Sequence, residues 1–403
     1  MESYFHNYCR LCNSDNLKTV LTLKKSPLCD VYLKEIEEQT FYPLGLKKCN
    51  DCDFVQINFV VPAELIYTDY IYETVASPGL SKHFASYSED VTKFLNLKSD
   101  STIIDIGSND GTLLKNFKDK GFNVIGIEPA NEIAKIANNN DIKTYPNFFT
   151  IELANQITRE NSHASVITVN NLFANVEDLN SFIESIDVLL NKNGVLIIES
   201  SYLFDMIENL VFDFIYHEHI SYISVRPLNK WLKGKGFRIN RIQKVATKGG
   251  SLRYYISRSG SNIEIDEGVK TYEKSEPSSQ SLNQLFHQFT KKINEQKKEL
   301  KTELQKYKGQ VIAGYGASAT STTLITHFEI ADDLDFLVDD NQIKIGTYSP
   351  GTHIPVLSLE QLCEKKPDLI IIIAWRFSKL IFEKIKKINC DIIVPIPEFK
   401  KLK

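Results

Sequence analysis

Residues 103–111 limit the fold of this chain more than any other stretch does. They read Ile-Ile-Asp-Ile-Gly-Ser-Asn-Asp-Gly, so aliphatic residues typical of a β-strand lead directly into a turn with two glycines. The apolar residues that follow, 112–114, predict a helix. A strand, a glycine turn and a helix in this order bring backbone N–H groups close to a ligand, because glycine has no Cβ to block its approach. The stretch therefore predicts an α/β domain with a ligand at this turn.

The second strand of the pattern, residues 123–127, ends at Glu128. An acidic side chain at this point of an α/β unit is placed to accept hydrogen bonds from a ribose diol. The first turn has the spacing Asp-x-Gly-x-x-Asp-Gly and lacks the Gly-x-Gly-x-x-Gly of a dinucleotide site. Together the two features favour S-adenosylmethionine as the ligand.

Strand and helix patterns continue to alternate through the central part of the chain. Apolar runs at residues 165–169 and 195–199 end at Asn170 and Glu199. Alternation of this kind predicts a parallel sheet, and ligands of such sheets lie at the carboxyl ends of the strands. We therefore expect Glu128, Asn170 and Glu199 to surround one cleft.

The totals set outer limits on the class of protein. A chain of 403 residues exceeds one ordinary core, so two or three domains are expected. A net charge of −4 argues against a general nucleic-acid binder. No apolar run approaches the roughly 18–20 residues that span a bilayer. The N-terminus lacks the basic and apolar regions of a signal peptide, so we expect a cytoplasmic protein.

Four cysteines form two Cys-x-x-Cys pairs, Cys9 with Cys12 and Cys49 with Cys52. Two such pairs supply four thiolates for a tetrahedral Zn²⁺, and four sulfur ligands leave no open position for catalysis. In a reducing cytoplasm this arrangement indicates structural zinc more than disulfides. Buried free thiols and a redox pair are the alternatives, although a redox pair has no need to be duplicated.

An aromatic stretch with Tyr70 and Tyr72 precedes Pro78. It fits either the lid of a cleft or an aromatic packing stripe between domains, and the spacing does not separate the two.

Further along, His217 and His219 flank Glu218. A histidine beside a carboxylate is the usual apparatus for taking a proton near neutral pH, so a catalytic base is our first interpretation. A structural polar core and a metal site are the alternatives, although three consecutive side chains do not share one face.

The segment 248–256 reads as a glycine turn that leads into a strand. Its glycines can let the backbone approach a ligand and Arg253 can bind an anion, or the segment is a plain turn with a surface arginine. Residues 258–280 are polar and predict a loop at a domain boundary, and apolar spacing over 282–307 predicts one face of a long helix.

The last segment begins a second α/β pattern. A strand runs into Gly314-x-Gly316-x-x-Ala319, and Asp339 follows about twenty residues on, which is the spacing of a dinucleotide fingerprint. The turn supports a rival function, an NAD(P)-dependent oxidoreductase acting on a nucleotide-sugar. The same turn also binds the diphosphate of any nucleotide, including a nucleotide-sugar.

Six motifs occur in one order along the chain. They are the four-cysteine module, Asp105–Leu113, Asn170–Ala174, Tyr216–His219, Gly249–Arg253 and Gly314–Ala317. Together they resemble the S-adenosylmethionine-dependent C-methyltransferases that act on nucleotide-linked keto-sugars in deoxysugar biosynthesis. The resemblance covers nearly the whole chain. It implies an N-terminal zinc-binding module and lid (1–78), a central Rossmann-like methyltransferase domain (79–280) and a C-terminal Rossmann-like α/β domain that helps bind the nucleotide-sugar (281–403).

The resemblance also implies a mechanism. A base removes the proton alpha to the sugar keto group, and the resulting enolate attacks the methyl sulfonium. His219 would be this base, with Glu218 and Tyr216 orienting it or stabilising the enolate oxygen, and Tyr70 or Tyr72 would be the lid tyrosine that touches the substrate. Methylation at C3 of a 4-keto-deoxysugar is the first expectation, and C5 or a heptose substrate is the next.

The remaining site residues follow from the same resemblance. The implied cofactor-binding residues are Asp105, Gly107, Ser108, Asn109, Asp110, Glu128, Pro129, Asn170 and Asn171. The implied substrate-binding residues are Asn175, Ser201, Arg253, Gly314, Tyr315, Gly316 and Asp339. The expected partners are the nucleotide-linked keto-sugar, no nucleic acid and no membrane, and the chain is expected to be a monomer.

The chain departs from the family pattern at four positions. Asn175 and Lys248 stand where the family often has histidine, and Ser318 and Thr320 replace a proline and a lysine in the C-terminal turn. The methyl-donor motif is intact, whereas the identity of the sugar, its nucleotide and the methylated carbon stay open. A zinc-anchored binding module without enzymatic activity is a further alternative.

Overall fold

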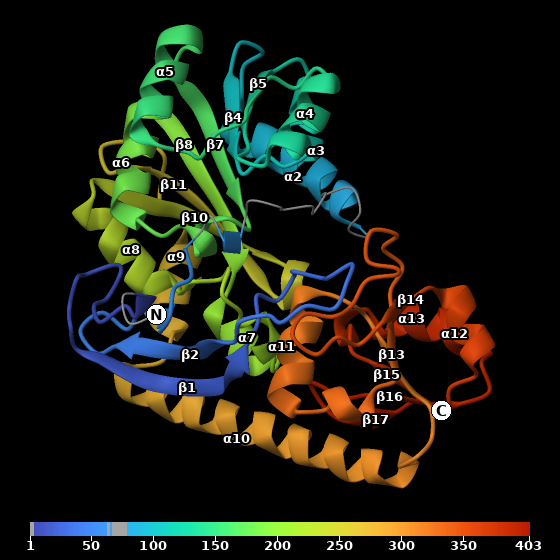
Figure 1. Ribbon diagram of the computed structural model, residues 1–403. Coiled ribbons are helices and arrows are strands. Elements are labelled where there is room, and N and C mark those ends of the chain that lie inside the picture. The colour runs from blue at the N-terminus through green and yellow to red at the C-terminus, as the bar shows by residue number, and fades with distance from the viewer. Residues whose placement is uncertain (1–3, 63–64, 67–78) are drawn as a thin grey trace.

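The computed structural model describes residues 4–62, 65–66 and 79–403, so Tyr70 and Tyr72 lie outside the described residues. Within these ranges the strands form three sheets of four, seven and six strands. The large sheet and its helices occupy the top of Figure 1, the N-terminal sheet lies beneath them, and the C-terminal sheet lies to the right. The predicted α/β class, with a Rossmann-like centre and a second α/β unit, is confirmed.

The central sheet has the strand order β10-β11-β8-β7-β4-β5-β6. Its strands are β4 (Thr102–Ile106), β5 (Asn123–Ile127), β6 (Thr144–Tyr145), β7 (Ala164–Asn170), β8 (Leu190–Ser201), β10 (Phe237–Val245) and β11 (Ser251–Arg258). Strands β6, β5, β4, β7 and β8 pair in parallel, and β11 is antiparallel to both of its neighbours. The chain moves outward from β4 to β6 and then returns to the other side of β4. The switch point between β4 and β7 is therefore where a ligand is expected to bind.

Helices cover both faces of the central sheet. One face carries α2 (Leu80–Leu95), α3 (Thr112–Lys118) and α4 (Asn131–Asn139), and the other carries α5 (Ile151–Asn161), α6 (Leu179–Leu189), α8 (Val225–Gly234) and α9 (Glu267–Ser275). Neighbouring residues of β4 point to opposite faces of the sheet. Ile103 packs in the core under α2, α3 and α4, and Ile104 packs in the core under α5, α6, α8 and α9. The prediction of a loop over 258–280 is wrong: α9 lies inside it, capped by Asp266 and packed through the buried Val269.

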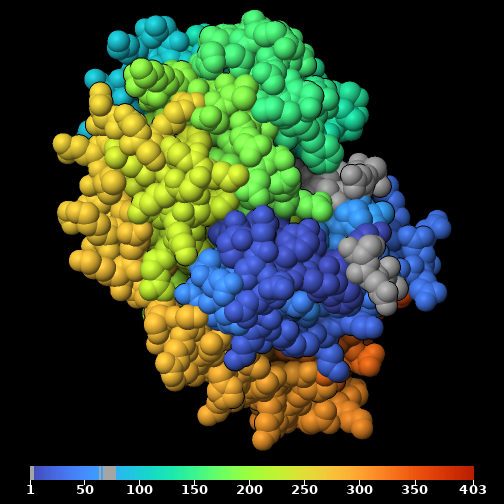
Figure 2. Space-filling view, turned by 90° about the vertical axis from the view of Figure 1, so that its left-hand side faces the viewer, coloured from blue at the N-terminus to red at the C-terminus, as the bar shows by residue number. Residues whose placement is uncertain are grey.

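The N-terminal sheet contains a strand from the middle of the chain. Strands β1 (Leu17–Ser26), β2 (Tyr42–Cys49) and β3 (Val55–Ile57) form a meander, and β9 (Ser221–Tyr222) pairs antiparallel with β3. In Figure 2 the N-terminal module, in blue, lies between the green and yellow central domain and the orange segment below. The segment that follows His219 is therefore part of the N-terminal sheet.

The C-terminal unit is a second, smaller α/β sheet. Its strands are β12 (Ile312–Tyr315), β13 (Phe336–Val338), β14 (Val356–Leu357), β15 (Leu369–Ile372), β16 (Asp391–Val394) and β17 (Lys400–Lys401). Its helices are α11 (Ala319–Phe328), α12 (Leu359–Lys365) and α13 (Ser378–Ile385). The long helix α10 (Ser279–Leu304) runs beneath β1 toward this sheet (Figure 1), and α7 (Leu203–Glu208) packs on it from above. One continuous core joins α7, α10 and both smaller sheets.

In the described part of the chain, no helix combines the length and the apolar character needed to cross a bilayer.

Candidate functional site

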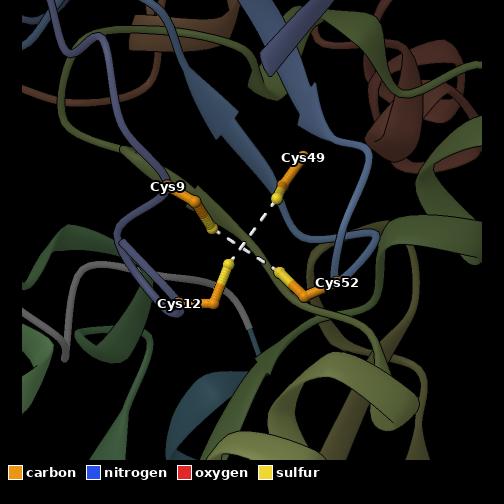
Figure 3. A group of neighbouring side chains, drawn as sticks. All are labelled: Cys9, Cys12, Cys49 and Cys52. Carbon is orange, nitrogen blue, oxygen red and sulfur yellow. Dashed lines mark hydrogen bonds between the residues drawn. The ribbon is translucent and has the colours of Figure 1, made fainter. Parts of the chain in front are cut away.

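The four cysteines converge on one point of the N-terminal module (Figure 3). Their sulfur atoms all lie within 4.8 Å of one another, with 3.5 Å between Cys9 and Cys52 and 3.6 Å between Cys12 and Cys49. Tetrahedral Zn²⁺ with four Zn–S bonds of about 2.3 Å places sulfurs roughly 3.8 Å apart. The donor set and its spacing therefore fit structural zinc, as the sequence predicts. In the described residues this is the one group of metal-ligating side chains that could hold an ion.

Arg10, inside the first cysteine pair, joins the metal site to the central domain. Its guanidinium is 5% exposed and donates to Ser221 Oγ at 2.5 Å and to the carbonyl oxygens of Val176 and Glu177. Its backbone N–H donates to Gln56 Oε1 at 2.9 Å. The cysteine knuckle is thus attached directly to β9 and to the loop after β7.

The first glycine turn lies at the switch point, as expected. Gly107 has φ +73°, and a Cβ at this position would come within 3.0 Å of the Leu172 side chain. The N–H groups of Asn109 and Ala130 donate to the two oxygens of Glu128 at 3.0 and 2.9 Å. Glu128 therefore connects the first turn to the end of the second strand. Burial raises its pKa, and the two backbone bonds oppose that rise.

Asp105, on the strand that leads into this turn, is held by two hydrogen bonds from β7. It is 3% exposed and accepts hydrogen bonds from Thr168 Oγ1 at 2.6 Å and from Asn170 Nδ2 at 3.3 Å. Burial raises its pKa to about 7. Ser108 Oγ and Asn170 Oδ1 are buried and have no hydrogen-bond partner among the described residues. Unsatisfied polar atoms beside a glycine turn fit a polar cofactor such as S-adenosylmethionine.

The other cofactor-site residues are placed around the same edge. Asp110 Oδ1 accepts hydrogen bonds from the backbone N–H and the hydroxyl of Thr112, the first residue of α3. Asn171 has φ +56°, and its N–H donates to the carbonyl oxygen of Glu199 at 2.8 Å. Pro129 is half-buried directly after Glu128.

A cavity opens beside this edge, and His219 lines it together with residues from the ends of β7 and β8. The lining residues are Asn171, Ala174, Ser200, Ser201, Tyr202, Leu203, Met206, Phe214, His219, Ser221, Tyr222 and Lys248. The expected substrate residue Ser201 is part of this lining. Asn175 is half-buried one residue beyond Ala174.

The hydrogen bonds of His219 define its tautomer. Nδ1 lies 3.1 Å from the carbonyl oxygen of Phe214, which can only accept, so Nδ1 carries the hydrogen. Nε2 then presents its lone pair, 3.3 Å from the hydroxyl of Tyr216. Burial, and then the charge of Lys248, lowers the pKa of His219 to about 4. The imidazole is therefore neutral at pH 7, with Nε2 unprotonated.

The two neighbours of His219 differ from it. His217 is 1% exposed and turns toward the N-terminal sheet, where Nε2 lies 3.2 Å from the Pro43 carbonyl oxygen. Burial, and then the charge of Asp30, raises the pKa of Glu218 to about 7, although Lys248 opposes this shift. Of the two histidines, one therefore packs the domain interface and one lines the cavity.

Arg253 is buried, so the alternative of a surface arginine is wrong, and its guanidinium is paired with a carboxylate. Arg253 and Glu199 are register partners on β11 and β8, and the guanidinium donates to Glu199 Oε2 at 2.9 and 2.8 Å. The guanidinium also lies 3.7 Å over the Tyr87 ring, and its side chain is 3% exposed. Glu199 accepts further bonds from His83 at 2.7 Å and from Thr247 at 3.3 Å. The pair is a buried structural unit below the cavity.

The glycines of the C-terminal turn are also explained by packing. A Cβ on Gly314 would meet Ile373 at 2.5 Å, and one on Gly316 would meet Ala374 at 2.5 Å, so close packing by itself requires glycine at both positions. Tyr315 is 2% exposed and donates to Asp340 at 3.0 Å. Asp339 accepts from the backbone N–H of Ala317 at 2.6 Å, which leaves it as a brace of the turn.

Sequence reasoning missed a set of charged residues between the C-terminal unit and the cavity. Arg376 donates to Asp213 at 3.0 Å and to Thr320 at 3.1 Å and lies 4.3 Å over the Phe214 ring. Lys344 pairs with Asp30 at 2.6 Å. Arg376 lies four residues after the last residue of the apolar strand β15, so the rule that strands end at ligand sites was the signal that would have found it.

Comparisons with known proteins agree with this geometry. Three family models match in chain order, described as "Putative zinc binding domain" over residues 9–67, "Methyltransferase domain" over 80–242 and "C-methyltransferase C-terminal domain" over 246–397. The C-methyltransferase NovU of Streptomyces niveus is 26% identical over 402 residues, which cover 97% of this chain and 95% of that protein.

Two solved structures of methyltransferases are similar to parts of the chain. A S-adenosylmethionine-dependent methyltransferase from Clostridium acetobutylicum ATCC 824 is 17% identical with a TM-score of 0.36, covering 49% of this chain and 96% of that one. Magnesium protoporphyrin IX methyltransferase from Synechocystis PCC 6803 is 15% identical with a TM-score of 0.35, covering 49% and 89%. These values are too low to carry an argument about function.

The fold, the glycine turn and the cysteine site define a methyltransferase that uses S-adenosylmethionine and holds structural zinc. Within that class, the chain belongs to the C-methyltransferases. This assignment contradicts the alternative of a zinc-anchored binding module without enzymatic activity. The matches give no support to an NAD(P)-dependent oxidoreductase.

Proposed function

We propose that this C-methyltransferase acts on a carbon alpha to the keto group of a nucleotide-linked 4-keto-deoxysugar, with C3 as the methylated position and His219 as the base. The observation that carries the proposal is the state of His219. Its Nδ1 is held as a donor by Phe214, and its unprotonated Nε2 lines the cavity beside the glycine-turn edge. Carbon bound to hydrogen is a poor nucleophile, so a C-methyltransferase of this kind needs such a base.

The neighbouring residues support the same chemistry. The hydroxyl of Tyr216 lies 3.3 Å from Nε2 of His219 and can orient the imidazole. Glu218, whose pKa is raised to about 7, precedes His219 in the chain. When bound, S-adenosylmethionine supplies an electrophilic methyl group. Gly107 and Glu128 would hold it at the switch point, with Asn170 beside the cavity.

The sugar and its nucleotide enter the proposal from the resemblance of the six motifs and from the position of the C-terminal unit. Residues of that unit reach the stretch that carries the base, since Arg376 contacts Asp213 and Phe214. The proposal includes the division into domains 1–78, 79–280 and 281–403, a monomeric state and a cytoplasmic location. It also keeps Tyr70 or Tyr72 as the lid tyrosine.

The test is hydrogen exchange at the substrate carbon. Thymidine diphosphate 4-keto-6-deoxyglucose and guanosine diphosphate 4-keto-6-deoxymannose are incubated in D₂O without methyl donor, and loss of the C3 or C5 proton signal is followed by NMR. We expect the wild-type protein to exchange one of them. His219→Ala should abolish both exchange and methyl transfer while S-adenosylhomocysteine still binds. His217→Asn, which changes the histidine that faces the N-terminal sheet, should retain exchange. Exchange retained by His219→Ala would remove His219 from the base role.

A further inference from the structure

A cation lines the His219 cavity as well. It is Lys248, the middle residue of the tight turn Thr247–Gly249 between β10 and β11. Its backbone has φ +57°, a conformation that is strained for a residue with a Cβ. Unfavourable backbone geometry of this kind persists where the surrounding structure enforces it, and it is concentrated at functional sites.

The surrounding residues enforce the turn. A Cβ on Gly250 would meet Asp205 at 2.5 Å, and Gly249 has φ +85° with Val211 only 3.1 Å from an added Cβ, so both positions favour glycine. Thr247 donates to Glu199 at 3.3 Å, which attaches the residue before Lys248 to the buried Arg253 pair. The lysine is therefore presented to the cavity from a rigid support.

We propose that the ammonium group of Lys248 donates a hydrogen bond to the substrate's carbonyl oxygen and stabilises the enolate that His219 generates. The proposal rests on the proposed function. In this step the alpha proton passes to Nε2 of His219, and the bonding pair moves onto the carbonyl oxygen. The ammonium group donates to that oxygen without losing its proton. The enolate pair would then form the new C–C bond as the methyl–sulfur bond of the donor breaks, with that bond's electrons staying on the neutral thioether of S-adenosylhomocysteine, and the imidazolium returns its proton to solvent.

The charges favour the enolate over the ground state. Before reaction, the cavity holds the neutral His219 and the Lys248 cation. After proton abstraction, His219 is also a cation, and two cations in one cavity repel each other. A negative oxygen between them removes this repulsion, so the arrangement is complementary to the transition state for deprotonation. Burial, and then the nearby Arg376 cation, lowers the pKa of Lys248, and Glu218 opposes that shift, which is consistent with an ammonium that lacks full hydration.

The experiment compares Lys248→Met with Lys248→Arg in the full-length zinc-loaded protein. Both side chains are unbranched at Cβ, so they tolerate φ +57° as lysine does. Lys270→Met, on the exposed face of α9, is the matched control. The readouts are the maximal exchange rate and KM for thymidine diphosphate 4-keto-6-deoxyglucose in D₂O, the affinity for S-adenosylhomocysteine by calorimetry, and Tm.

We expect Lys248→Met to slow maximal exchange by about 10²–10³-fold, the loss typical of one oxyanion donor, with KM changed by less than about threefold. Lys248→Arg should recover at least about tenfold of that loss, since it restores a cationic donor. Affinity for S-adenosylhomocysteine and Tm should stay near those of Lys270→Met. These readouts separate a lost donor from a damaged fold.

Two results would overturn the inference alone. Exchange by Lys248→Met at the wild-type maximal rate would exclude a role in enolate formation. A raised KM with an unchanged maximal rate would make Lys248 a contact of the diphosphate instead. Absence of exchange by the wild-type protein on both sugar nucleotides would instead overturn the proposed function, and the inference with it.

Discussion

The buried pair of Glu199 and Arg253 gives a prediction whose size follows from the structure. Glu199→Gln removes the negative charge from a site where the carboxylate is 0% exposed and the guanidinium 3% exposed. Two hydrogen bonds of 2.9 and 2.8 Å from Arg253 lose their charged acceptor, each worth about 1.5–3 kcal/mol. The amide nitrogen of glutamine would also face donors from Arg253, His83 or Thr247. Breaking one partner of a buried ion pair typically costs about 3–5 kcal/mol, and we expect that range.

The assay is urea unfolding followed by tryptophan fluorescence, since Trp231 lies in the core of the same domain. Asp187→Asn is the matched control, because Asp187 pairs with Arg258 of the same strand β11 but is 57% exposed. Exposed pairs contribute about 0–1 kcal/mol. The free energy of unfolding of Glu199→Gln should therefore fall several times further than that of Asp187→Asn. Equal effects of the two substitutions would refute the reasoning.

The same pair also separates a structural arginine from a substrate clamp. Arg253→Met should destabilise the protein, and adding it to Glu199→Gln should cost less than the two single effects combined, since no unpaired charge is left behind. A substrate clamp would instead raise KM for the sugar nucleotide with little change in the free energy of unfolding.

Further predictions concern the metal, the methyl-donor turn and two titrating groups. Cys49→Ser should lower the bound zinc, about one per chain in the wild-type protein by atomic absorption, and should lower Tm. Gly107→Ala should weaken S-adenosylhomocysteine binding about tenfold by calorimetry, because φ is +73° and the new Cβ would press on Leu172 at 3.0 Å. Since the pKa of His219 is lowered to about 4, the exchange rate should lose its His219-dependent part only below that pH and not near 6.5. The pKa of Glu218 is raised to about 7, so between pH 4.5 and 7 the folded protein holds a proton that the unfolded chain has released. The free energy of unfolding of the wild-type protein should therefore fall as pH rises from about 4.5 to 7. Glu218→Gln should lack this fall when urea unfolding is measured at pH 5 and pH 8.

Local patterns predicted much of this molecule. The cysteine pairs specify their ligand chemistry by spacing alone, and the helix predicted from the apolar residues 112–114 is α3. The rule on carboxyl ends of strands placed Glu128, Asn170 and Glu199 at one edge of the sheet. The turn at Gly107 was found because its conformation requires glycine.

Two of the errors arise where distant segments decide the outcome. Arg253 could not be assigned to Glu199 from the sequence, because β11 enters the sheet antiparallel beside β8 only after a long excursion. Glycines at 314 and 316 read as a nucleotide fingerprint, yet close packing against β15 and the residues after it explains both. Helix α9 was missed since its single fully buried apolar residue, Val269, gives little periodicity. The roles of Arg253 and of the two glycines depend on partners that are distant in the sequence, whereas α9 was missed because its local pattern is weak.

Because Arg10 is attached to Ser221, loss of the metal should affect residues outside the N-terminal module. Ser221 stands two residues after His219, in a strand that pairs with β3 of the cysteine-bearing sheet. If a chelator removes the zinc, the cysteine knuckle should become less ordered, and this loss of order would extend through Arg10 and Ser221 to the imidazole of His219. The turn at Gly107 belongs to a different sheet and should keep its structure. A zinc-starved cell would then accumulate enzyme that retains its methyl donor yet no longer acts on its substrate.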